Sequence, residues 1–280
     1  MIELVVFYAL LAAITWGVGD FLGGFTTKTS HVSITVFVGH TIGLLMLIPF
    51  YFILDEENLS RNEIMFSAVA GLSGVVGLYM LYMGLSKGKM GYVAPISAVI
   101  AMMLPVIVGF LDHGFLELSK YIGIFLAIGS IWGLTKGDVG TLSKSDLFYA
   151  IMSGLGIGLF LIFISYGGKD ATFSPMIVAR IASVALFFII VMYRKGKGSS
   201  FGYLGNRQMI LICGSGFFDM TANLLFIKAT QYGALEIASI LSSLYPTTTI
   251  ILSWIILKDK IEKEKLIFLV GILVSIVLLA

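Results

Sequence analysis

The sequence has one cysteine and few charged residues. Cys213 lies in an apolar run, so the chain cannot form an internal disulfide or a cysteine-based metal cluster. Charged residues make up 12% of the 280 residues, against about 25% in ordinary soluble domains. The net charge of +2 is spread over short loops, so no surface for nucleic acid is expected.

Sequence motifs of catalysis and nucleotide binding are also missing. The chain has no Gly-rich phosphate loop, no His-Glu-x-x-His, no Gly-x-Ser-x-Gly and no cluster of histidines with carboxylates. The short loops leave no room for a nucleotide-binding domain, which excludes an ATP-driven pump. We therefore expect no catalytic residues, no cofactor and no metal, and a protein that is not an enzyme.

Apolar residues are abundant and fall in long runs. They make up 58% of the chain, and the runs do not alternate with polar residues as the strands of a barrel would. Because lipid offers the backbone no hydrogen-bonding partners, each run is expected to be a membrane-spanning helix. The first run lacks a basic leader and a cleavage site, so we interpret it as a retained helix.

The sequence thus predicts an all-α integral membrane protein of ten transmembrane helices. The predicted spans are Leu4–Gly24, Val32–Leu54, Ile64–Ser86, Tyr92–Leu111, Tyr121–Thr135, Leu147–Tyr166, Pro175–Tyr193, Met209–Thr230, Leu235–Leu257 and Leu266–Ala280.

The connections between these helices differ in charge. The odd-numbered connections hold thirteen Lys and Arg residues and the even-numbered ones four, with Arg180 inside a helix. Basic loops stay in the cytoplasm, so this bias predicts a plasma-membrane protein with both termini outside the cytoplasm.

The chain repeats itself. Ser73–Gly74 and Gly91 are spaced as Ser215–Gly216 and Gly233, and a proline follows each later glycine, at Pro105 and Pro246. The same alignment sets Gly39–His40 against Ala179–Arg180 and matches Gly17 with Gly158. Two halves of five helices each, residues 1–137 and 138–280, would enter the membrane with opposite polarity and form an inverted repeat. The alternative is that apolar segments align by composition alone.

These residues resemble a known family. Trp16–Gly17, Arg180, the phrase Ala229–Thr230–Gln231–Tyr232–Gly233, and Pro246 followed by Asp259 are similar to the pattern of the EamA-type transporters of the drug/metabolite transporter superfamily. The resemblance spans nearly the whole chain and implies two five-helix repeats and transport of a metabolite. The sequence departs from the pattern at His40, where the family favours arginine, and at Asp259, where it favours glutamate.

Ionisable residues inside the predicted helices are the candidates for a substrate site, because each costs at least about 2.5–3.5 kcal/mol to place in a membrane. Asp219 lies in the middle of the eighth helix with Asn223 one turn later. The pair could hold an amine, or Asp219 could bind a proton. Alternatively, Asp219 pairs with Arg180 and fixes helix packing. Arg180 would suit a substrate carboxylate if it faces a cavity, or it could extend toward the interface.

Further candidates are a histidine and several aromatic residues. His40 could relay a proton or serve packing. Tyr79 and Tyr245 could form an amphipathic wall for substrate. Asp20 either lines a cavity mouth or sits at the headgroups, and we expect Lys228 and Glu236 to be solvated. Pro105 and Pro246 are expected to bend their helices.

Three classes of function remain: a secondary transporter, a membrane-embedded enzyme and a channel-like bundle. The interior polar residues are too few and too asymmetric for a channel. We therefore predict a transporter that works by alternating access on a small organic metabolite, with or without coupled protons, and in which a monomer could suffice. Arg180, Asp219 and nearby aromatics favour an amino acid or a related compound, with sugars and nucleotide-linked compounds as alternatives.

Overall fold

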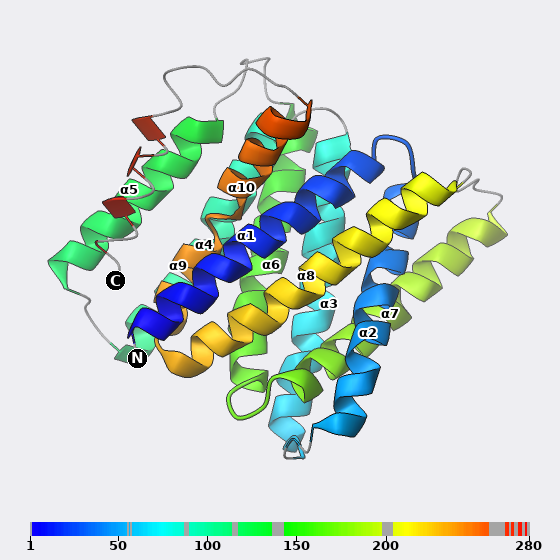
Figure 1. Ribbon diagram of the computed structural model, residues 1–280, viewed down its shortest axis with the longest axis horizontal. Coiled ribbons are helices and arrows are strands. Elements are labelled where there is room, and N and C mark those ends of the chain that lie inside the picture. The colour runs from blue at the N-terminus through cyan, green and yellow to red at the C-terminus, as the bar shows by residue number, and fades with distance from the viewer. Residues whose placement is uncertain are drawn as a thin grey trace.

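A computed structural model describes the fold. It covers residues 2–54, 56, 58–86, 90–113, 117–135, 143–197 and 204–257, and isolated positions between 267 and 278. The described chain is helical almost throughout (Figure 1). The helices are α1 (Ile2–Thr26), α2 (Val32–Ile53), α3 (Arg61–Ser86), α4 (Met90–His113), α5 (Leu118–Thr135), α6 (Lys144–Gly167), α7 (Phe173–Gly196), α8 (Asn206–Tyr232), α9 (Leu235–Ser242), α10 (Tyr245–Leu252) and a short π-helix, Ser253–Leu257.

The predicted all-α membrane fold is confirmed, although not every predicted span is. Seven helical segments of the described chain are long and apolar enough to cross a membrane, and the last of them, Leu235–Ile256, combines α9, α10 and most of the π-helix. The apolar parts of α4 and α5, Ile96–Gly109 and Leu118–Ser130, are shorter. The predicted tenth helix, Leu266–Ala280, lies mostly outside the described residues.

Most helices begin several residues before the predicted apolar runs. At α3 the N–H of Ser60 donates to Glu63 Oε2 (2.7 Å) while the Ser60 hydroxyl accepts from the Glu63 N–H (3.3 Å). Ser143 and Asp146 form the same reciprocal cap at the start of α6. These caps satisfy the first backbone donors, so the helices extend into polar sequence that hydropathy alone excludes.

The ninth predicted span, Leu235–Leu257, is helical but is interrupted near Pro246, where a bend is expected. α9 ends at Ser242 and α10 begins at Tyr245. Pro246 follows the break, and its ring would clash with the Ser242 carbonyl group in an unbroken helix and would leave that group without a donor. α4 continues through Pro105, the matching proline of the first half.

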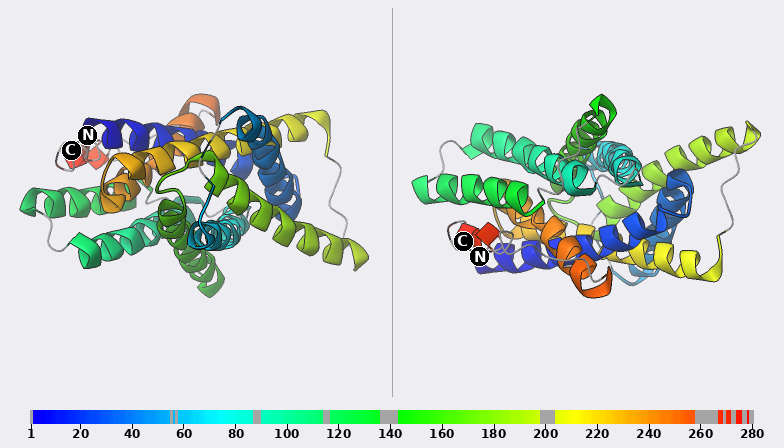
Figure 2. Two further views of the ribbon diagram at one scale, coloured as in Figure 1. Left: turned by 90° about the horizontal axis from the view of Figure 1, so that it is seen from below. Right: turned by 90° about the horizontal axis from the view of Figure 1, so that it is seen from above.

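Contacts between helices occur in equivalent pairs. In each pair, the second contact is made by the helices that correspond to those of the first in the other half of the chain. α3 packs against α6 as α8 packs against α1, and α3 packs against α7 as α8 packs against α2. α4 contacts α6 as α9 and α10 contact α1, while α2 and α7 contact each other. α4 and α5 lie together at one side of the bundle, and the ends of α7 and α8 extend at the other (Figure 2).

The glycines that aligned the two halves make equivalent contacts. Gly158 of α6 lies against α4 beside Pro105, where an added Cβ would be 2.9 Å from a backbone carbonyl oxygen. Gly17 of α1 lies against α10 beside Pro246, where an added Cβ would be 2.6 Å from the carbonyl oxygen of Tyr245. Both positions require glycine because the facing backbones are too close for any side chain.

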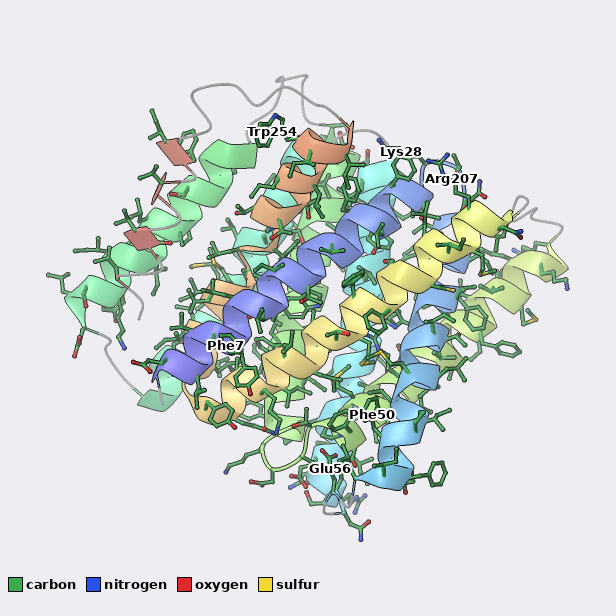
Figure 3. The ribbon with its side chains drawn as sticks, in the orientation of Figure 1. Phe7, Lys28, Phe50, Glu56, Arg207 and Trp254 are labelled. Carbon is green, nitrogen blue, oxygen red and sulfur yellow. The ribbon has the colours of Figure 1, made fainter. Side chains whose placement is uncertain are left out.

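The outer surface of the bundle is apolar, as lipid requires. Large side chains such as Phe52, Leu111, Phe125 and Ile210 are exposed, whereas the buried core combines alanine and aliphatic residues with aromatic ones such as Phe226. Lys28 and Arg207 lie at one end of the bundle and Glu56 at the opposite end (Figure 3).

Glu56 joins the halves at its end of the bundle. Its carboxylate accepts hydrogen bonds from the backbone N–H groups of Thr172, Phe173 and Ser174, at 2.8–3.0 Å. These donors form the first turn of α7, so Glu56 caps a helix of the other half. Burial alone would raise the pKa of the Glu56 carboxyl, but the hydrogen bonds from Ser174, Phe173 and Thr172 outweigh it and lower the pKa below its ordinary value.

Glu56→Gln is expected to lower the stability of the purified protein by about 1 kcal/mol at neutral pH, because the cap loses its charge. Since the folded state lowers the pKa of Glu56, its contribution is complete above the ordinary value of 4.5 and is lost as pH falls through the lowered pKa. Unfolding in detergent at a series of pH values should show the two proteins converging in acid. The exposed Glu117→Gln serves as control, and a difference that persists at low pH would contradict the charge-based explanation.

Candidate functional site

A cavity lies between the two halves. It holds about 70 Å³ of space open to water-sized molecules, enough for several waters. Its polar lining comes from five helices and from the break before α10: Asp20, His40, Arg180, Ser183, Asp219, Asn223, Ser243 and Tyr245. Its apolar lining includes Trp16, Val75, Leu78, Leu81, Ile157, Phe160, Leu161 and Met176.

Arg180 and Asp219 form the central ion pair of this cavity. Arg180 Nη2 donates to Asp219 Oδ2. The arginine side chain is 5% exposed and the aspartate 21%, so the carboxylate keeps access to the cavity while the guanidinium is buried. The pair joins α7 to α8, and each charge compensates the other where lipid cannot.

His40 is hydrogen-bonded to the same guanidinium. Arg180 Nη1 donates to His40 Nδ1 (2.7 Å), and the Ser183 hydroxyl lies 2.9 Å from the same ring nitrogen. Because a guanidinium has no acceptor, Nδ1 must be unprotonated and the ring proton of the neutral imidazole sits on Nε2. His40 Nε2 is buried and has no hydrogen-bond partner among the residues that the structure describes. His40 and Arg180, which the internal alignment matched, therefore contact each other across the two halves.

Asn223 and Tyr245 complete the set of predicted residues that line the cavity. Asn223 Nδ2 donates to the backbone oxygen of Asp219 one turn earlier (2.6 Å). Tyr245 begins α10 at the break in the ninth span, and its hydroxyl is buried without a hydrogen-bond partner. The break thus brings Tyr245 and Ser243 to the cavity, as discontinuous helices do in transporter sites.

Close backbone contacts place His40 and Arg180. A Cβ on Gly216 of α8 would lie 3.0 Å from the Cα of Gly39, the residue before His40. A Cβ on Gly71 of α3 would lie 2.7 Å from the Cα of Ala179, the residue before Arg180. Small residues at these two crossings bring α2 close to α8 and α3 close to α7, beside His40 and Arg180.

Tyr79 is the one predicted site residue that does not line the cavity. Its hydroxyl accepts from Arg194 Nη2 (3.3 Å), and its ring packs against Phe187. Arg194 Nη1 also lies 2.7 Å from His31 Nε2. The fold thus places Tyr79 in a separate polar group that joins α3 to the last turn of α7.

Two other expectations need correction. Glu236, expected to be solvated, is 2% exposed, because α9 turns its first residues inward against Gly109 of α4. Lys228 is partly buried and donates to Gln231 Oε1 (3.1 Å). Gln231 in turn donates to the backbone oxygens of Gly168 and Ala171, so it ties the end of α8 to the connection between α6 and α7.

Several cavity residues were left undecided or unnoticed by sequence reasoning. Asp20 lines the cavity, which decides between its two predicted positions, and Trp16 lies one turn before it on α1. Ser183 follows Arg180 by one turn. Helical spacing from a chosen residue, at i+3 or i+4, would have identified both Trp16 and Ser183 as neighbours of charged groups.

Comparison with known proteins identifies the family. The sequence model of the EamA-like transporter family matches the chain twice, over residues 3–136 and 144–280. The chain belongs to the EamA-like transporter family. Both repeats of this EamA-like protein are therefore present, and it is a multi-pass membrane transporter. No curated protein matches the chain.

Solved structures show the same fold. One crystal structure aligns with this EamA-like protein at a TM-score of 0.79 and 12% sequence identity, over 98% of this chain and 97% of the other. An identity this low extends the likeness to the fold alone.

The Arg180–Asp219 pair should behave as one unit in stability. Arg180→Met or Asp219→Asn alone leaves its partner's charge buried without compensation, whereas the double variant removes both charges. We expect the double variant to be more stable than the sum of the single effects predicts, by about 0.5–3 kcal/mol. Reversible unfolding of the four proteins in detergent measures this interaction energy, and additive effects would show that the two side chains are not coupled.

Proposed function

We propose that this protein is a secondary transporter that carries an amino acid or a related small metabolite by alternating access. The observation that carries the proposal is the cavity itself. Both halves contribute to it, and its only guanidinium within the described residues is held by Asp219 and shared with His40. Transport is favoured over catalysis because the family is one of transporters.

The proposed binding residues are those of the lining: Arg180, Asp219, Asn223, His40 and Tyr245. A guanidinium held in place by a carboxylate is preorganised to receive a second anionic group through its remaining donors. Arg180 Nε has no hydrogen-bond partner in the described structure. The aromatic and aliphatic walls suit an apolar side chain, so a carboxylate-bearing metabolite with an apolar body fits the cavity. Tyr79 is left out of this set.

The architecture proposed for transport is an inverted repeat of five plus five transmembrane helices, divided into residues 1–137 and 138–280. The exchanged helix contacts and the equivalent glycine contacts support it. Two such halves can rock about a central site, and the broken ninth span places flexible backbone beside it. One chain supplies both halves, so a monomer suffices.

Transport should depend on Asp219. Purified protein in proteoliposomes is expected to accumulate labelled amino acid from a mixture, and Asp219→Asn to reduce the initial rate at least about tenfold, because Arg180 loses the charge that positions it. The rate with and without an imposed pH gradient tests proton coupling separately.

Asp170→Asn is the matched control, since Asp170 is exposed on the loop before α7 and does not line the cavity. Uptake by the native protein that equals protein-free liposomes would refute transport of amino acids. Equal initial rates of uptake in the native protein and Asp219→Asn would show that Asp219 serves packing and not transport.

We further propose that the protein lies in the plasma membrane. The basic end of the bundle then faces the cytoplasm, and both termini lie outside it. Lys28 and Arg207 mark this end, opposite Glu56 (Figure 3). With Cys213→Ser as background, Lys28→Cys should resist a membrane-impermeant maleimide in intact cells and react after lysis. Asn58→Cys, exposed beside Glu56, should react in intact cells. The reverse pattern would invert the topology.

A further inference from the structure

The cavity holds one more carboxylate than its cations can neutralise. Among the described residues, its lining includes the guanidinium of Arg180 and the carboxylates of Asp219 and Asp20. Arg180 is paired with Asp219. Asp20 makes no ion pair or side-chain hydrogen bond in the described part of the chain, although Asp219, Tyr82 and Tyr245 are close enough to interact with it electrostatically.

The packing of α1 holds Asp20 at this place. Gly19 directly precedes Asp20, and Gly23 follows it by about one turn. Both glycines lie against α8, where a Cβ on Gly19 would be 3.2 Å from the Asp219 nitrogen. The neighbouring Ser215 hydroxyl already donates to the Gly19 oxygen (2.8 Å), and the Tyr82 hydroxyl lies 3.5 Å from Ser215 Oγ. These hydroxyl groups are engaged with one another and with the backbone, so Asp20 is left facing the cavity.

An uncompensated carboxylate is costly inside a membrane-spanning helix. Ionised residues there are rare, and they pair with another group or mark a pathway. The protein supplies Asp219 with a cation but supplies none to Asp20 within the described residues. A cation from the substrate would complete the charge balance.

The surroundings of Asp20 indicate the chemistry of that cation. Trp16 lies one turn away on the same helix face and lines the cavity, so it can contact an ammonium group through its ring. On the side of α2, the Nε2–H of His40 is a buried donor without a partner among the described residues. A residue with an acceptor group and a residue with a donor group thus line the same cavity, together with apolar walls and the polar side chains of Asn223 and Ser243.

We propose that Asp20, and not Asp219, recognises the ammonium group of a zwitterionic substrate with an apolar side chain, while Arg180 and His40 bind its carboxylate. This assignment rests on the proposed transport of amino acids and names the substrate class: neutral amino acids with an apolar side chain. Asp219 is then a positioning residue for Arg180.

Leucine analogues that each lack one charged group test the assignment. The labelled probe is leucine, and the competitors are 4-methylpentanoate, which lacks the amine, and 3-methylbutylamine, which lacks the carboxylate. Equilibrium binding to purified protein and uptake into proteoliposomes are both measured for the native protein, Asp20→Asn, Asp20→Glu and the exposed control Asp170→Asn. Asp20→Ser is a second neutral variant in case Asp20→Asn is not recovered folded.

The native protein should prefer leucine to 4-methylpentanoate by at least about tenfold, the equivalent of one charge-assisted hydrogen bond. In Asp20→Asn that preference should disappear through weaker binding of leucine, with affinity for 4-methylpentanoate unchanged. Asp20→Glu should recover part of the preference, and Asp170→Asn should match the native protein.

The outcomes separate the two proposals. Native protein that neither binds nor carries leucine, nor any amino acid of a labelled mixture, would overturn the proposed function and this assignment with it. Native activity with the preference for leucine intact in both neutral variants would overturn the role of Asp20 alone. If both neutral variants keep the preference for leucine but their uptake no longer depends on a pH gradient, Asp20 is a proton carrier. That result also overturns the assignment.

Discussion

Lipid provides no counter-charge, and the centre of this transporter is arranged around that constraint at Arg180. Its guanidinium is buried in the bundle and is compensated by Asp219 from α8 and by an accepting nitrogen of His40 from α2. Three helices from both halves are thereby joined at one side chain. Glycines allow close crossings next to this group: Gly216 brings α8 close to α2 beside His40, and Gly71 brings α3 close to α7 beside Arg180.

The same constraint applies to the polar groups that have no hydrogen-bond or ion-pair partner among the described residues. A soluble protein could leave them to water, but in a membrane each one costs free energy unless a ligand or water in the cavity satisfies it. His40, Arg180, Tyr245 and Asp20 all line one cavity between two related halves, and His40 Nε2, Arg180 Nε and the Tyr245 hydroxyl have no hydrogen-bond partner among the described residues. Their concentration there is what supports a substrate site over a static packing centre.

Sequence reasoning succeeded where a local property decided the outcome. Apolar runs located the helices, and glycine and proline spacing revealed the duplication that the family match confirms. It failed at Glu236, where charge suggested solvent and the packing of α9 produced burial. It also treated Pro105 and Pro246 alike, although only the second proline follows a break. Each proline removes one backbone hydrogen bond, and the neighbouring helices decide whether the rest of the ladder survives.

By itself, the sequence determined that this chain lies in a membrane, is helical, consists of two related halves and places Asp219, Arg180 and His40 inside helices. Hydrophobicity and residue spacing are properties of the sequence, so they can be recognised without knowing how the helices pack. Only the tertiary structure decided that Arg180 contacts both Asp219 and His40, that Tyr79 lies elsewhere and that Asp20 faces the cavity with no cation beside it in the described part of the chain. Those facts depend on how helices distant in sequence rotate and approach, which is set by the packing of all of them together.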